Sequence, residues 1–304
     1  MAVKDITGMI FDISRFCLHD GPGIRTTIFL KGCPLRCAWC HNPEGLSPLP
    51  NLFYDVATCI SCGRCVKVCK QGCHILDKGK HVYERKSCMS CGACSTVCPT
   101  GAIERAGRKV TVRKVLEVVE RDKAYYSDGG LTLSGGEPFF QPDFALSLLE
   151  AAKMAKLSTC VETSGFCSSD VIRDSIPYVD CYLFDCKETD PSRHLAYTGV
   201  SLDRIQRNLC LLGEADRRII LRCPVIPGYN DRTDHMEGIA LLIDRLPSVA
   251  GVELIPYHPL GVGKYHKLGL EPKCLQEIPL NREKIMELAT LLRELTKVPV
   301  TIEE

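Results

Sequence analysis

The sequence predicts an α/β fold with a parallel sheet, interrupted by a small cysteine-rich unit. After residue 105, segments with apolar residues at helical spacing alternate with short runs rich in β-branched residues. Strands that alternate with helices form parallel sheets with right-handed crossovers. Between residues 50 and 104 this alternation stops, and cysteines recur at short, regular intervals. The alternation alone is compatible with a partial barrel or with an open, doubly wound sheet.

Two strands are expected before the cysteine-rich unit, at residues 5–16 and 24–30, with a turn by composition at Asp20-Gly-Pro-Gly23 between them. Thr111 is a plausible N-cap for a helix over residues 111–120, whose apolar residues share one face. The other predicted helices cover residues 142–156, 168–175, 201–212, 233–246 and 281–296. The other predicted strands lie near residues 131–134, 158–163, 179–185, 218–224, 251–256 and 298–302.

The composition is that of an ordinary globular protein, with 45% hydrophobic and 25% charged residues over 304 positions. A net charge of +1 gives no sign of a nucleic-acid or acidic-membrane partner. Neither a signal peptide nor an apolar run of membrane-spanning length is apparent, so we expect a cytoplasmic protein. The 20 cysteines then indicate metal or redox chemistry rather than disulfides, because the chain is neither small nor exported.

The first candidate site is the motif CxxxCxxC, formed by Cys33, Cys37 and Cys40. Three thiolates can hold a [4Fe-4S] cluster while one iron stays open, and an open iron can bind a small molecule through nitrogen and oxygen atoms. The alternative is a structural zinc site, which requires four protein ligands. His41 is adjacent to Cys40 and badly placed to be the fourth ligand, so the pattern favours a catalytic cluster.

This stretch, with Trp39 just before the third cysteine, resembles the radical S-adenosylmethionine (SAM) superfamily. The preceding run Asp20-Gly-Pro-Gly-Ile-Arg-Thr26 resembles the signature of glycyl radical enzyme activating enzymes. The resemblance implies a partial (β/α)6 barrel built from residues 1–49 and 105–304, with its site at the carboxyl ends of the strands. It also implies the reaction: SAM is cleaved reductively to methionine and a 5′-deoxyadenosyl radical, which takes a hydrogen from a backbone glycine of a partner glycyl radical enzyme.

Further motifs follow the predicted barrel strands. In Ser134-Gly-Gly-Glu-Pro138 the two glycines allow backbone to approach a ligand closely, and Glu137 can accept a hydrogen bond from an ammonium group. By resemblance this run binds the amino group of SAM, and Lys187 binds the carboxylate. The full set of SAM-binding residues implied by the resemblance is Trp39, Gly135, Gly136, Glu137, Lys187, Arg222 and His258.

Two further roles are implied by the resemblance. Glu162, Thr163 and Asp185 would line a site for Na+ or K+ near SAM, with Glu162 in place of the family's usual Asp. Asp20 and Arg222 would help to receive the glycine loop of the partner enzyme. The alternative for residues of this kind is a polar side chain that merely solvates the end of a strand.

The cysteine-rich unit, residues 50–104, contains the spacing CxxCxxCxxxC twice, about 29 residues apart. This is the bacterial ferredoxin pattern, in which the last cysteine of each run binds the cluster of the other run. By that rule one [4Fe-4S] cluster is held by Cys59, Cys62, Cys65 and Cys98, and a second by Cys88, Cys91, Cys94 and Cys69. Lys70 follows Cys69 where the pattern has Pro, and Cys73 is a competing ligand. A zinc-binding insert is the alternative, which the doubled spacing disfavours.

The expected activator therefore uses three [4Fe-4S] clusters and SAM, and receives electrons from flavodoxin or ferredoxin. A second hypothesis is a radical SAM enzyme that modifies a small molecule or peptide, with the extra clusters as electron relays. A third is a multi-cluster electron carrier, which has no need for three-cysteine ligation or for the SGGEP run. The sequence does not rank the partner enzymes, state whether the extra clusters are obligatory, or give the oligomeric state.

Overall fold

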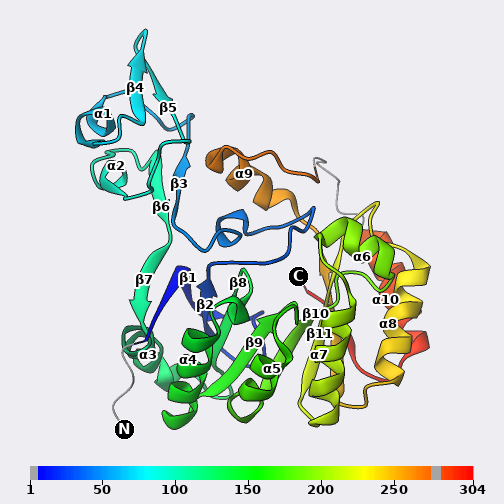
Figure 1. Cartoon of the computed structure of the whole chain (residues 1–304). Coiled ribbons are helices and arrows are strands. Elements are labelled where there is room, and N and C mark those ends of the chain that lie inside the picture. The colour runs from blue at the N-terminus through cyan, green and yellow to red at the C-terminus, as the bar shows by residue number, and fades with distance from the viewer. Residues whose placement is uncertain (1–5, 275–281, 304) are drawn as a thin grey trace.

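The computed structural model describes residues 6–274 and 282–303, and the main body is an open, mostly parallel sheet with helices on its outer side (Figure 1). The nine strands follow the order β13-β12-β11-β10-β9-β8-β2-β1-β7. The parallel strands are β2 (Arg25–Leu30), β8 (Gly130–Gly135), β9 (Ser158–Thr163), β10 (Cys181–Asp185), β11 (Ile219–Val225), β12 (Val249–Pro256) and β13 (Val300–Ile302). The predicted parallel α/β architecture is thus confirmed.

The two remaining strands lie antiparallel at one edge. β1 (Thr7–Cys17) pairs with β2, and β7 (Arg108–Thr111) pairs with β1. Within the described residues β7 and β13 are the end strands, so the sheet does not close on itself. The short β13 lies within the strand predicted at residues 298–302, and it carries the parallel sheet one strand beyond the sixfold repeat that the family resemblance implied.

The helices cover the outer face of the sheet because each presents an apolar stripe to it. On α3, the predicted face is buried through Val112, Val115 and Val119, and Thr111 caps the helix by accepting from the backbone N–H of Lys114 at 3.2 Å. Each fully buried aliphatic side chain of this kind contributes about 1.5–3 kcal/mol. The covering helices are α3 (Val112–Arg121), α4 (Pro142–Met154), α5 (Ser169–Ser175), α7 (Asp203–Glu214), α8 (Thr233–Asp244) and α10 (Arg282–Leu295).

Several elements were not predicted. Two short helices, α6 (Pro191–Thr198) and α9 (Val262–Leu268), lie in segments left unassigned by the sequence. The short 3-10 helices are η1 (Pro43–Gly45), η2 (Lys123–Tyr125), η3 (Pro138–Phe140), η4 (Ile176–Tyr178) and η5 (Pro259–Gly261). Residues 5 and 281, the predicted starts of the first strand and the last helix, lie outside the described residues.

The cysteine-rich unit projects from the body on an antiparallel stem, visible at the upper left of Figure 1. The stem consists of β3 (Asn51–Tyr54) and β6 (Ile103–Ala106), which pair along their whole length. Beyond it lie α1 (Arg64–Val68), the hairpin of β4 (His74–Asp77) and β5 (Lys80–Tyr83), and α2 (Ala93–Thr96). The unit has its own small core of buried residues: Leu52, Tyr54, Cys65, Cys94 and Ile103.

Helix α9 connects this unit to the body. Lys267 at its C-terminal end forms an ion pair with Asp55 at 2.9 Å, and the Lys267 carbonyl accepts from Arg85 Nη2 at 2.7 Å. At the other end of the helix, Lys264 forms an ion pair with Glu44 at 2.7 Å and a hydrogen bond to Asn42 at 3.0 Å. One short helix therefore contacts both the projecting unit and the loop after β2.

Candidate active site

A cavity of about 320 Å³ lies at the carboxyl ends of the parallel strands, where the fold predicts a site. Several strands deliver a side chain to it. Among these, Ser134 and Glu162 are the next-to-last residues of β8 and β9, Asp185 is the last residue of β10, and Arg222 lies in the middle of β11. Residues distant in sequence therefore share one wall because the strands are in register, with Asp185 paired with Arg222.

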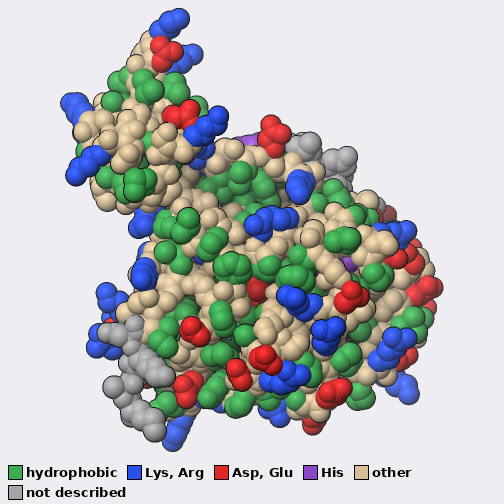
Figure 2. Space-filling view, viewed as in Figure 1, with side chains coloured by type: hydrophobic (Ala, Val, Ile, Leu, Met, Phe, Trp, Pro, Cys, Tyr) green, Lys and Arg blue, Asp and Glu red, His purple; other side chains and the backbone are tan. Residues whose placement is uncertain are grey.

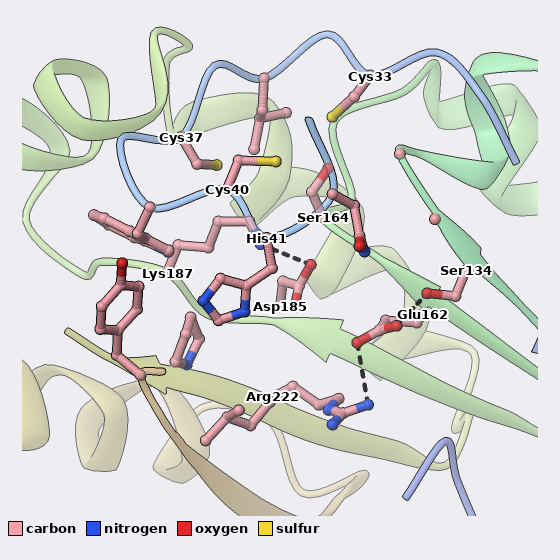
Figure 3. A pocket seen from close by; sticks show the side chains of 18 of the residues that line it. Cys33, Cys37, Cys40, His41, Ser134, Glu162, Ser164, Asp185, Lys187 and Arg222 are labelled. Atoms are coloured by element: carbon pink, nitrogen blue, oxygen red, sulfur yellow. Dashed lines mark hydrogen bonds and ion pairs between the residues drawn. The ribbon is translucent and has the colours of Figure 1, made fainter. Parts of the chain in front are cut away.

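The loop after β2 covers this cavity and carries three cysteines. Figure 3 shows Cys33, Cys37 and Cys40 on this loop above Lys187, and all three line the cavity. None of the cysteines in the described chain forms a disulfide. Burial raises the pKa of the Cys37 thiol to about 12, so a thiolate there requires a strong cationic partner. Three unpaired thiols that face one cavity fit a three-ligand iron-sulfur cluster.

The unpredicted helix α6 helps to hold the cysteine loop. The backbone N–H of Arg36 donates to the carbonyl of Thr198 at 2.7 Å, and that of Ala38 donates to the carbonyl of Tyr197 at 2.9 Å. Trp39 is buried, with its ring edge-on to Tyr197 at 5.9 Å. Trp39 therefore both lines the cavity and anchors the loop.

Lys187 lies beside Asp185 at the end of β10. Lys187 Nζ is 2.9 Å from Asp185 Oδ2, and both side chains are largely buried. Burial alone would lower the pKa of Lys187, but Asp185 and the nearby Cys37 sulfur outweigh it and raise this pKa. The lysine is therefore a fixed ammonium group that can bind a carboxylate.

Arg222 lies among acidic side chains and is 5% exposed. Its Nη1 is 3.1 Å from Glu162 Oε1 and 3.9 Å from Asp20 Oδ1, and its Nε is 3.5 Å from Glu253 Oε2. Its Nη2 also pairs with Glu303. Within the described residues, the charged side chains that line the cavity are the acids Asp20, Glu162, Asp185 and Glu303 and the bases Lys187 and Arg222. This excess of acid favours a cationic ligand such as a sulfonium.

Glu137 lies behind the cavity wall rather than in it. Its fully buried carboxylate accepts from Thr163 Oγ1 at 2.8 Å, from the backbone N–H of Ser164 at 2.9 Å, from Ser164 Oγ at 2.6 Å and from the backbone N–H of Phe139 at 3.2 Å. These four donors occupy the positions at which an ammonium group would bind. Thr163, whose hydroxyl is committed to Glu137, does not line the cavity either.

The backbone of Gly135 and Gly136 forms the wall in front of Glu137. A Cβ added at Gly136 would lie 2.4 Å from the carbonyl oxygen of Gly32, and one at Gly135 would lie 2.4 Å from the backbone nitrogen of Leu30. The N–H of Gly136 donates to the Leu30 carbonyl at 2.8 Å. The two glycines thus allow β8 to pack directly against the start of the cysteine loop.

The remaining predicted residues are at the rim. Asp20 accepts from Thr27 Oγ1 at 2.6 Å and lines the cavity from the β1–β2 loop. His258 follows β12, and its ring stacks on that of His41 at 4.2 Å. Burial, reinforced by His258, lowers the pKa of His41 to about 4.

Sequence reasoning missed three contributors. Tyr265 on α9 is buried, and burial together with the nearby Cys40 sulfur raises the pKa of its hydroxyl. Glu253 on β12 and Glu303 after β13 both pair with Arg222. The sequence did contain a signal for the two acids, which is their position. Glu253 lies near the middle of one predicted strand and Glu303 follows another, at the carboxyl-end edge of the sheet where the other charged residues lie.

The cysteines of the projecting unit fall into two groups. One small cavity is lined by Cys59, Cys62, Cys65 and Cys98, and another is lined by Cys69, Cys73, Cys88, Cys91 and Cys94. These are the crossed groups that the spacing predicts, with Cys73 added to the second. The backbone N–H of Cys73 donates to Cys69 Sγ at 3.3 Å, so the two competing cysteines lie together.

Comparison with known proteins shows which family this chain resembles. Residues 27–240 match the model of the radical SAM superfamily. The chain is 41% identical over 271 residues to the choline trimethylamine-lyase activating enzyme of Oleidesulfovibrio alaskensis, covering 86% of this chain and 87% of that one. It is 40% identical over 303 residues to the isethionate sulfite-lyase activating enzyme of Nitratidesulfovibrio vulgaris, covering 97% and 98%.

A solved structure supports the fold. Streptococcus suis SuiB bound to its precursor peptide SuiA superposes with a TM-score of 0.54 at 10% identity, covering 90% of this chain and 46% of that one. No helix in residues 6–274 or 282–303 has the length and apolarity to cross a membrane. The relatives, the matched superfamily and the cavity with its three cysteines together establish that the chain belongs to the radical SAM superfamily, and within it to the activating enzymes of glycyl radical enzymes.

Proposed function

We propose that this chain activates its glycyl radical enzyme with three [4Fe-4S] clusters, one in the cavity and two in the projecting unit. The observation that carries the proposal is the arrangement of Cys33, Cys37 and Cys40 opposite a wall of charged strand-end residues. Residues 1–49 and 105–304 then form the catalytic barrel, and residues 50–104 form a ferredoxin-like electron-transfer domain.

The cavity residues are suited to bind and orient SAM. The three cysteines would hold three irons of the cluster, and the cluster when bound supplies the electron that cleaves SAM. Lys187, held by Asp185, would bind the carboxylate of SAM. The exposed backbone of Gly135 and Gly136 would contact its amino group, while Glu137 fixes the turn behind them.

The acidic side chains would complete the binding of a cationic substrate. Glu162 and Asp185 line the cavity and are the proposed ligands of Na+ or K+, with Thr163 positioned behind them through Glu137. Arg222 and Asp20 would receive the glycine loop of the partner, with His258 at the rim. The loop that carries the three cysteines covers the cavity and would limit the access of water to a reactive radical.

The crossed cysteine groups support two further clusters in the projecting unit. Burial would raise the pKa of the Cys69 thiol, but backbone N–H groups of Cys73 and Gln71 outweigh it and lower this pKa. Burial would likewise raise the pKa of the Cys98 thiol, but the backbone N–H groups of Ile103 and Thr100 outweigh it and lower this pKa. Because Cys69 matches Cys98 in this respect, we assign Cys69, rather than Cys73, as the crossed ligand.

The projecting unit is also suited to meet an electron donor. Residues 50–104 contain seven Lys and Arg against four Asp and Glu, and Figure 2 shows many of these basic side chains on the surface of the unit. An acidic partner such as flavodoxin or ferredoxin would be complementary to this surface. Helix α9 then joins the unit to the cavity through Lys267 and Tyr265.

The test is electron paramagnetic resonance (EPR) of the anaerobically reconstituted protein with SAM, a reductant and the candidate glycyl radical enzyme encoded nearest to it. We expect a persistent glycine-type doublet that requires both SAM and Cys37. The relatives above activate two different lyases at nearly equal identity, so the doublet also identifies the partner. SAM cleavage without a doublet would favour a small-molecule or peptide substrate, and no cleavage at all would favour an electron carrier.

A further inference from the structure

The projecting unit contains two buried histidines for which the electron-transfer role described so far has no use. His74 begins β4 and His81 lies on β5, and both side chains are buried. Their rings stack with centroids 5.0 Å apart, and His74 Nδ1 is 3.0 Å from His81 Nε2. At this distance the two rings share a hydrogen bond.

His81 contacts the first group of cysteines. Its Nε2 is 3.4 Å from Cys65 Sγ and its Nδ1 is 3.7 Å from Cys59 Sγ. Whichever ring nitrogen carries the hydrogen, a sulfur of this group is within hydrogen-bond distance of it. A hydrogen bond to a ligating sulfur stabilises the more negative, reduced cluster and so raises its reduction potential.

His74 contacts the second group. It lines the second cavity together with Cys69 and Cys88. Its ring stacks on that of Tyr83, with the ring centroids 4.7 Å apart. His74 Nε2 is buried with no hydrogen-bond partner in the described part of the chain. The two rings thus connect the cavity of the second group with Cys65 of the first.

The internal repeat shows that the pair is an addition to the common framework. Shifted by 29 residues, Tyr54 corresponds to Tyr83. The positions that correspond to His74 and His81 are Ile103 and Leu52, two aliphatic residues of the small core. The two halves therefore share tyrosines and cysteines, but these positions are histidines in the β4–β5 hairpin and aliphatic residues in the β3–β6 stem.

We propose that the His74–His81 pair is the electron-transfer link between the two clusters of the projecting unit, and that His81 raises the reduction potential of the first cluster. This rests on the two clusters proposed above. In the transfer one electron leaves the reduced cluster and enters the oxidised one, with no bond made or broken. The two hydrogen-bonded rings give the electron a path through bonded and contacting atoms between the clusters.

The experiment exchanges the pair for the residues of the other half, as His74→Ile together with His81→Leu, in the full anaerobically reconstituted chain. Redox titration followed by EPR should show one potential lowered by about 59 mV or more, which is a tenfold change for a one-electron couple. The other two potentials should not move. Electron exchange between the two clusters, followed after flash reduction, should slow at least tenfold.

Matched controls alter the same core without removing an N–H group. Leu52→Val with Ile103→Val changes the corresponding positions and should leave all three potentials in place. His81→Gln retains a side-chain N–H and should recover part of the lowered potential.

The iron and zinc content of each protein distinguishes the possible outcomes of this experiment. About twelve irons per chain with unchanged potentials and exchange would overturn the link. Loss of four irons in His81→Leu would make His81 a ligand and would also overturn it, as would one zinc bound by Cys65, His74 and His81, whose ligand atoms lie within 4.8 Å of one another. About four irons in the unaltered chain would instead refute the two clusters on which the inference rests.

Discussion

The cavity at the strand ends and the projecting unit both present groups of cysteines, but they surround them differently. The three cysteines of the cavity face the charged side chains Lys187, Asp185, Glu162 and Arg222, whereas Cys59 and its group lie beside Ile103, Pro99 and His81. Charged walls suit a site that binds a polar ligand. Walls with few charged side chains suit a site that holds a cluster and exchanges only electrons.

The largest expected effect comes from Cys37→Ala, which removes a ligand from the open site. SAM cleavage should be abolished, while about eight irons remain in the projecting unit. Product analysis for 5′-deoxyadenosine and iron content measure the two effects. Cys210→Ala changes an exposed cysteine outside all three groups and should alter neither. If cleavage survives in Cys37→Ala, the catalytic assignment of the cavity is wrong.

Lys187→Met should weaken SAM binding by tenfold to a hundredfold, because a charge-assisted hydrogen bond contributes about 1.5–3 kcal/mol. Calorimetric titration of SAM into the reconstituted protein measures this. Lys153→Met is the matched control, since Lys153 forms an exposed ion pair with Asp180 at 2.6 Å far from the cavity. Equal SAM affinity in both variants would show that charge in the cavity wall does not select the ligand.

Gly136→Ala should destabilise the fold by about 1–3 kcal/mol, because the new methyl group would press against the Gly32 carbonyl. Thermal unfolding measures the loss, and the cluster of the cysteine loop should be lost before those of the projecting unit. Gly263→Ala on α9 provides the control, as its added Cβ has no neighbour within 4 Å. A melting temperature unchanged in Gly136→Ala would contradict the close packing of β8 on this loop.

The smallest effect concerns α6, which supports the cysteine loop. Burial lowers the pKa of His194, whose Nδ1 lies 3.0 Å from the carbonyl of Val200. The unfolded chain therefore binds a proton at this residue more readily than the folded chain, and stability falls as pH drops below about 6.5. In the His194→Gln variant, the loss of unfolding free energy between pH 7 and pH 5.5 should be smaller by roughly 1 kcal/mol. Chemical denaturation at the two pH values measures this loss. An identical decline in both proteins would exclude His194 as its source.

Features set by local sequence were predictable. The strands of the parallel sheet and the α3 cap at Thr111 follow from short-range spacing, and the two cysteine groups follow from the repeated cysteine motif. Helix α6 could also have been found, because Asp190 caps it by accepting from the N–H of Arg193 at 2.8 Å and Gly199 ends it at a φ of +77°.

The features that were missed depend on segments that meet only in the folded chain. The commitment of Glu137 to four donors required the approach of Ser164, a residue of the next strand's loop. Likewise, Tyr265 reaches Cys40 across 225 residues of sequence. Spacing along a chain carries no information on such contacts, so it does not reveal that the Glu137 carboxylate accepts hydrogen bonds from the chain itself.

The paired stem of β3 and β6 also bears on how the chain folds. β2 ends at Leu30 and its parallel neighbour β8 begins at Gly130, so nearly 100 residues must be closed into a loop before these strands pair. The stem joins Asn51 to Ala106 and removes the intervening residues from that loop. Shortening the loop to about half its length saves roughly 0.6 kcal/mol of closure entropy. A unit that folds first on such a stem can therefore be inserted between two strands of a parallel sheet at little kinetic cost.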